Sequence, residues 1–243
     1  MQLWALLESL PYFVEPHIIL KTDDEYVKNY HQVMQKFPFD FVEEHNFELD
    51  TRKLLQTKHS TTMFLTDDCV FFRQPHTPPP IEPHETFSFR YGINTTLQNH
   101  VIHQYQTDLN LYTDYPTHIE WDTSFYPYPY NYAYSIALDG HIFSSCKLRE
   151  LCDRIHWTST NQLEGCLQQF RGEIPIIKSH HHSSLVSIPT NNLSQITMAG
   201  AFHGNSVEEL NDLFSQGKRI NIKKTFDSVS IIGSHMEIPL VIE

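Results

Sequence analysis

The sequence predicts an α/β fold: one domain, residues 1–243, built on a mixed, mostly parallel sheet that is flanked by helices. Two observations favour this class. Between residues 17 and 66, short apolar runs alternate with segments whose apolar residues repeat at helical spacing, as in parallel strands joined by crossover helices. The chain has 243 residues, of which 40% are hydrophobic, so it can bury a substantial core.

The first half of the chain supplies strands and helices in alternation. Leucines at helical spacing predict a first helix that begins at residue 2 and ends near Pro11. Thr22 and Glu25 form a capping box for the second helix, and Asn46 can cap the third. The remaining elements of this half are predicted as strand 17–20, helix 26–37, strand 39–42, helix 46–55 and strand 62–66.

The second half is richer in loops. Five prolines between Gln74 and Pro83 predict an extended loop. Ser206 and Glu209 form a second capping box, and Gly217 ends the helix that this box begins. Apolar runs predict strands at 86–91, 134–138, 185–188 and 238–242, and helical spacing predicts helices at 148–155 and 163–170.

Composition excludes several classes of protein. Lys and Arg number 17 against 29 Asp and Glu, a net charge of −12, so general binding to nucleic acid is not expected. The four cysteines form no CxxC pair, which argues against a structural zinc site or a disulfide framework. With no export signal and no apolar run of about 20 residues, we expect a cytoplasmic protein without an integral membrane span; a peripheral position at a membrane remains open.

Asp67 and Asp68 follow the apolar run Met63–Thr66. If this run is a buried strand, the two carboxylates lie at its carboxyl end, where ligands bind in open α/β sheets. Neighbouring carboxylates repel unless a cation neutralises them, and oxygen ligands of this kind suit Mg²⁺ or Mn²⁺. The alternative is a turn with two solvated acids.

The order of motifs "HIILKTDDEYVKNY", "TTMFLTDDCVFF", "FSFRYGINTT", "LDGHIF" and "NQLEG" resembles that of bacterial glycosyltransferases of the GT-A type. The resemblance covers roughly residues 2 to 170. It implies a nucleotide-binding half at 1–70, an acceptor-side half at 84–243, and transfer of a sugar from a nucleotide-diphosphate sugar to a saccharide or lipid-linked acceptor, with inversion. This chain opens in a helix, so the first strand of that fold either is absent or lies upstream of residue 1.

The resemblance also assigns roles to acidic residues. Asp68 becomes the metal ligand and Asp67 the contact to the sugar nucleotide, while Cys69 stands where many relatives have a third acid. Glu164 becomes the general base that removes a proton from the acceptor hydroxyl; alternatively, Asn161 caps a helix and Glu164 is its capping partner. Asp139, before Gly140, would line the acceptor or donor-sugar pocket; alternatively it belongs to a tight turn.

Two basic residues and one aromatic segment complete the candidates. Arg90 could bind a phosphate of the donor through two hydrogen bonds, or form a surface ion pair. His180 could add a metal ligand, or lie in a solvated turn with the two histidines that follow it. The tyrosines and prolines of residues 112–134 could form an acceptor loop whose rings stack on sugars, or pack on the core.

Two other classes of function stay open. A non-catalytic carbohydrate-binding or degenerate transferase module would have the same scaffold, and the absent first strand and Cys69 favour it. A metallohydrolase that uses the histidines would spread its ligands over several strands and leave one metal position open.

Overall fold

The alternation predicted for the first half is present in the computed structural model, which describes residues 1–22, 26–56, 58–99, 104–105, 108–188 and 205–243. The helices and strands of this half are α1 (Gln2–Ser9), β1 (His17–Leu20), α2 (Val27–Lys36), β2 (Asp40–Glu43), α3 (Phe47–Leu55), β3 (Thr61–Met63) and β4 (Cys69–Phe71). Asn46 caps α3 as predicted, because its side chain accepts from the amide of Leu49. The capping box of α2 lies partly outside the described residues, since it includes Glu25.

The second half continues with β5 (Glu85–Ser88), β6 (Leu97–Asn99), β7 (Gln104–Tyr105), β8 (Thr113–Asp114), β9 (Ile119–Asp122), β10 (His141–Ser144), α4 (Ser145–Cys152), α5 (Thr160–Leu167), β11 (Ile176–Ser179), β12 (Leu185–Ser187), α6 (Val207–Ser215) and α7 (Ile222–Phe226). The capping box Ser206–Glu209 is present at α6. Gly217 follows that helix with a positive φ of 85°, as predicted. None of the helices within the described residues could cross a membrane.

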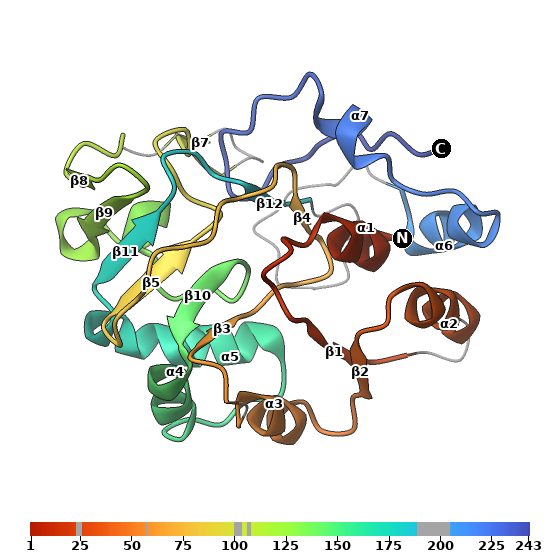
Figure 1. The fold of residues 1–243 in the computed structure, drawn as a ribbon, viewed down its shortest axis with the longest axis horizontal. Coiled ribbons are helices and arrows are strands. Elements are labelled where there is room, and N and C mark those ends of the chain that lie inside the picture. The colour runs from red at the N-terminus through yellow and green to blue at the C-terminus, as the bar shows by residue number, and fades with distance from the viewer. Residues whose placement is uncertain (23–25, 57, 100–103, 106–107, 189–204) are drawn as a thin grey trace.

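The main sheet has six strands in the order β3-β10-β5-β11-β9-β8 (Figure 1). Only β5 and β11 pair in parallel in this sheet, and its other neighbours are antiparallel. The sheet is therefore mixed, and the prediction of a mostly parallel sheet is wrong. The physical reason is the connection from β5 to β10: its described residues form short strands, loops and 3-10 turns but no α-helix, so the crossover helix that usually joins parallel neighbours is not present there.

The parallel pair predicted at the start of the chain exists, but as a separate two-stranded sheet of β1 and β2. Figure 1 shows this pair beside α2 and α3, apart from the larger sheet. Helices α4 and α5 contribute Leu148, Leu151 and Leu163 to one buried cluster. Helix α1 packs on a second cluster with the phenylalanines of β4 and β5.

Three of the predicted strands are shorter than expected or absent. β3 ends at Met63, because Phe64 and Leu65 leave the ladder and pack into two different clusters. Residues 134–138 are not a strand; side chains satisfy their backbone instead, with Glu164 accepting from the amide of Leu138 at 2.8 Å. Residues 238–242 form only an isolated bridge, Ile220 to Ile242.

Candidate functional site

A buried ion pair lies at the end of β5. The guanidinium of Arg90, whose residue is 2% exposed, pairs with the carboxylate of Asp139. It also donates to the carbonyl of Ser234 at 2.9 Å and to Nδ1 of His235 at 2.8 Å. The prediction of a surface ion pair is wrong about the location, since both partners are buried. The same contacts already engage the guanidinium that a donor phosphate would need.

The pair fixes the charge of Asp139. Burial alone would raise the pKa of this carboxyl, but the charge of Arg90, together with the hydrogen bond and charge of His235, lowers it below the ordinary value. Burial would lower the pKa of Arg90, but the charge of Asp139, the hydrogen bond to it and smaller charge contributions together raise this pKa above its ordinary value. Asp139 is therefore a stable anion that is matched to its cation, which makes it a poor proton acceptor.

Asp139 lies in a tight turn that only glycine can complete. Gly140 has a φ of +91°, and a Cβ there would collide with Cδ2 of Leu185. The amide of Gly140 donates to the carbonyl of Phe64 at 2.9 Å, and its carbonyl accepts from Phe89 at 3.0 Å. These hydrogen bonds hold the turn between the residues that follow β3 and those that follow β5. The Asp-Gly pair therefore forms the tight turn that was one of its two interpretations from sequence.

Glu164 faces this ion pair from α5. Ser159, not Asn161, caps the helix, so Glu164 is not the partner in a cap and that alternative is wrong. Its carboxylate accepts from the hydroxyl of Tyr134 at 2.6 Å and from the amide of Leu138 at 2.8 Å. Burial, followed by the charge of Asp139, raises the pKa of Glu164, although these two hydrogen bonds act to lower it. A raised pKa is what a general base requires.

The paired acids lie in a turn between β3 and β4. Asp68 accepts from the hydroxyl of Thr66 at 2.6 Å, and its main-chain carbonyl accepts from Ile188 at 2.9 Å. Asp67 is exposed to solvent, yet many protein atoms lie around its carboxylate. Desolvation by these atoms, followed by the charge of Asp68, raises the pKa of Asp67. The acids therefore follow β3, a partly exposed edge strand that ends at Met63, and do not lie at the end of a buried strand as predicted.

Cys69 cannot stand in for the third acid. Its thiol is fully buried, and burial, followed by the charges of Asp68 and Asp139, raises its pKa to about 12. A thiol in this state stays protonated at neutral pH, and only the thiolate is a good metal ligand. The charges acting on Cys69 and on Glu164 also show that four candidates, Asp68, Arg90, Asp139 and Glu164, belong to one electrostatic cluster.

Asp67 lines a cavity of about 650 Å³ between α1, β1, α3 and β3. This volume lies within the range of about 300–1,000 Å³ that is usual for ligand sites. Thr66, Leu138 and Thr160 also line it, so the cavity reaches the turn before β10 and the start of α5. Asp67 thus meets a space that could hold a nucleotide, whereas Asp68 does not line it.

His180 lies elsewhere. Its Nε2 faces the carbonyl of His76 at 3.0 Å and its Nδ1 faces that of Thr117 at 3.3 Å. Its neighbour His181 pairs with Asp114 at 2.7 Å. Within the described part of the chain, no third His, Cys, Asp or Glu completes a three-ligand set with Asp67 and Asp68.

The aromatic segment divides between the two predicted roles. Trp121, Tyr126 and Tyr132 are buried in one cluster. The outer rings, which are 39% to 61% exposed and could meet a sugar, are those of Tyr112, Tyr115, Phe125 and Tyr128.

Sequence reasoning missed His141, which lies beside the cluster. Burial lowers its pKa to about 4, its Nδ1 faces the carbonyl of Ser135 at 3.1 Å, and its Nε2 is buried without a hydrogen-bond partner among the described residues. Its position after Asp139-Gly140 was a usable signal. Tyr134 and His235 were also missed, and the partners that make them part of the cluster are far away in sequence.

Comparisons with family models, with curated proteins and with solved structures gave no significant match to this chain. The chemistry of the site therefore rests on its own geometry: two adjacent acids of which Asp67 lines a cavity, a buried Arg–Asp pair and a carboxylate with a raised pKa.

Proposed function

We propose that the protein is a metal-assisted glycosyltransferase that moves a sugar from a nucleotide-diphosphate sugar to a saccharide or lipid-linked acceptor. The proposal rests on one observation, which is that two features lie close together in the structure. Asp67, the neighbour of Asp68 in the chain, lines a cavity of about 650 Å³ that reaches Leu138, and Glu164, a carboxylate with a raised pKa, accepts from the amide of Leu138 at 2.8 Å.

The residues present fit a divalent ion with oxygen ligands. Desolvation is the larger cause of the raised pKa of Asp67, and the charge of Asp68 adds to it; a bound cation would relieve this second contribution. Two carboxylates and water or phosphate oxygens are the usual ligands of Mg²⁺ and Mn²⁺. When bound, such an ion would stabilise the charge of the departing diphosphate.

The chain's own residues supply the proton transfer. Glu164 accepts the proton of the acceptor hydroxyl, and its raised pKa brings it closer to neutral pH, where a general base works best. Tyr134 and the amide of Leu138 hold the carboxylate in place. Arg90 and Asp139 position the turn on which Leu138 lies, rather than taking part in the proton transfer.

The test is an assay of sugar transfer and of donor hydrolysis with Mn²⁺ across common nucleotide sugars. We expect Glu164→Gln to lower turnover at least 100-fold while nucleotide affinity stays unchanged. Asp212→Asn, an exposed acid on α6, is the matched control and should keep full activity. Wild-type turnover in Glu164→Gln would remove this residue as the base.

A non-catalytic sugar-binding module is the second candidate. Two observations favour this second candidate: Cys69 is protonated, and Arg90 is paired with Asp139. Both reduce the number of groups that could bind a diphosphate. This function predicts saccharide binding without turnover of any donor in the same assay.

A further inference from the structure

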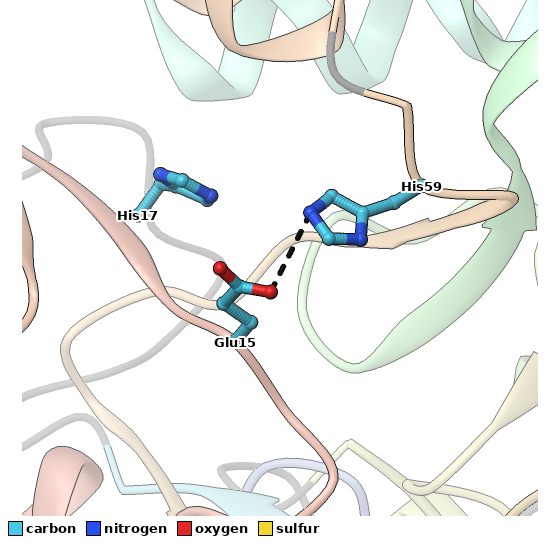
Figure 2. A group of neighbouring side chains, drawn as sticks. All are labelled: Glu15, His17 and His59. Carbon is cyan, nitrogen blue, oxygen red and sulfur yellow. Dashed lines mark ion pairs between the residues drawn. The ribbon is translucent and has the colours of Figure 1, made fainter.

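Three side chains with potential metal-ligand atoms line the same cavity as Asp67. They are Glu15, His17 and His59, whose ligand atoms all lie within 4.8 Å of one another. Figure 2 shows the carboxylate of Glu15 lying between the two imidazoles. Nε2 of His59 is 3.6 Å from Oε2 of Glu15, and the two rings are 6.5 Å apart between centroids. This is the one such group of three within the described residues.

His17 is oriented as a metal ligand. Its Nδ1 lies 3.0 Å from Oδ2 of Asp40; because a carboxylate can only accept, Nδ1 carries the proton of the neutral ring. The lone pair is then on Nε2, which is buried and has no hydrogen-bond partner in the described structure. Metal-binding histidines commonly donate their other nitrogen to a carboxylate in this way.

The strand register explains why Asp40 is available. His17 and Asp40 are the first residues of β1 and β2 and are paired directly across that parallel ladder. Their side chains therefore project to the same side of the pair. The register of the strands thus places the Asp40 carboxylate, whose side chain is 59% exposed, beside His17.

The group spans two parts of the fold that share no strand pairing. Glu15 and His17 belong to β1 and the segment before it, while His59 precedes β3. Among the described residues, β1 pairs only with β2, and β3 only with β10. An ion bound here would join the small sheet to the main sheet across the mouth of the cavity.

We propose that Glu15, His17 and His59 form a zinc site that clamps the β1–β2 pair to the main sheet. Two imidazoles and one carboxylate suit Zn²⁺ and leave one position for water, whereas Mg²⁺ and Ca²⁺ prefer all-oxygen sites. Zn–N bonds of about 2.0–2.1 Å place tetrahedral ligand atoms roughly 3.4 Å apart. Glu15 and His59 have side chains that are 72% and 51% exposed, so they are free to close that remaining gap.

The test uses the full chain, stripped of metal with a chelator and titrated with ZnCl₂ alone by calorimetry. We expect one zinc ion per chain. His59→Ala should weaken binding at least 10-fold, and Asp40→Asn should weaken it 10- to 100-fold through the orientation of His17. Zinc at a hundredfold excess over Kd should raise Tm by about 5 °C or more in the wild type, and by far less in His59→Ala.

The matched control is His182→Ala, an exposed histidine in the run of three. It should leave both zinc affinity and the rise in Tm unchanged. The proposal is overturned if His182→Ala removes the binding while His59→Ala keeps it, or if zinc binds without raising Tm. Cobalt gives an independent readout, because a His-His-Glu site produces visible absorption bands that His59→Ala should remove. The inference does not depend on the proposed transferase function.

Discussion

Removing one partner of the Arg90–Asp139 pair should destabilise the protein more than removing both. In Arg90→Met, Asp139 keeps the 3.5 Å contact to His235 but loses its cation, and it lies close to another carboxylate, Glu164. Breaking a buried pair in this way costs about 3–5 kcal/mol. The double variant Arg90→Met/Asp139→Leu leaves neither charge of the pair. The main losses are then the hydrogen bonds of Arg90 to Ser234 and His235, together worth about 1–3 kcal/mol.

The assay is urea unfolding followed by circular dichroism, with the free energy of unfolding measured for the wild type, both single variants and the double variant. Arg73→Met, which removes an exposed arginine, is the control and should change stability by less than about 0.5 kcal/mol. The reasoning is refuted if Arg90→Met costs under about 1 kcal/mol, or if the double variant loses the sum of the two single losses.

Two further predictions concern the same region. The pKa of His141 is lowered to about 4 from 6.5, so the unfolded chain binds the extra proton first; stability should fall as pH drops from 6.5 to 4, by roughly 3 kcal/mol. Tm measured against pH should have a shallower slope in His141→Gln, and equal slopes would contradict the account. Gly140→Ala should cost about 2 kcal/mol or more by thermal unfolding, because of its positive φ and the contact with Leu185. Gly165→Ala on α5, where a Cβ meets nothing within 4 Å, should instead be neutral or stabilising by up to about 1 kcal/mol; comparable losses in both would count against the reasoning.

Local signals predicted the helices well. The cap at Asn46 and the capping box at Ser206 depend on contacts within four residues, so sequence contains all that determines them. The strands that failed depend on distant partners. Residues 134–138 have the apolar pattern of a buried strand, but Gln168 and Glu164 take the hydrogen bonds that a neighbouring strand would have formed.

The direction of the sheet was also beyond local information. Alternating helices and strands correctly predicted the parallel pairing of β1 and β2. The same pattern could not show that β10 enters between β3 and β5 in the opposite direction. That arrangement depends on partners far away in sequence, such as the backbone hydrogen bonds of Gly140 to Phe64 and Phe89.

The candidate site was predicted in part. The structure brings Asp68, Arg90, Asp139 and Glu164 into one cluster, although each lies in a different segment of the chain. His180 has other partners. The proposed zinc ligands form no motif that could be recognised in the sequence, because 41 residues lie between His17 and His59. Only the fold brings them together.

Calorimetric titration of UDP, with and without Mn²⁺, tests the central claim most directly. The account predicts that the wild type binds UDP in a Mn²⁺-dependent manner, and that Asp67→Asn/Asp68→Asn loses at least 10-fold in affinity while its Tm stays within a few degrees of the wild type. The account is contradicted if both proteins bind UDP with equal affinity, or if the affinity of the wild type for UDP is the same with and without Mn²⁺.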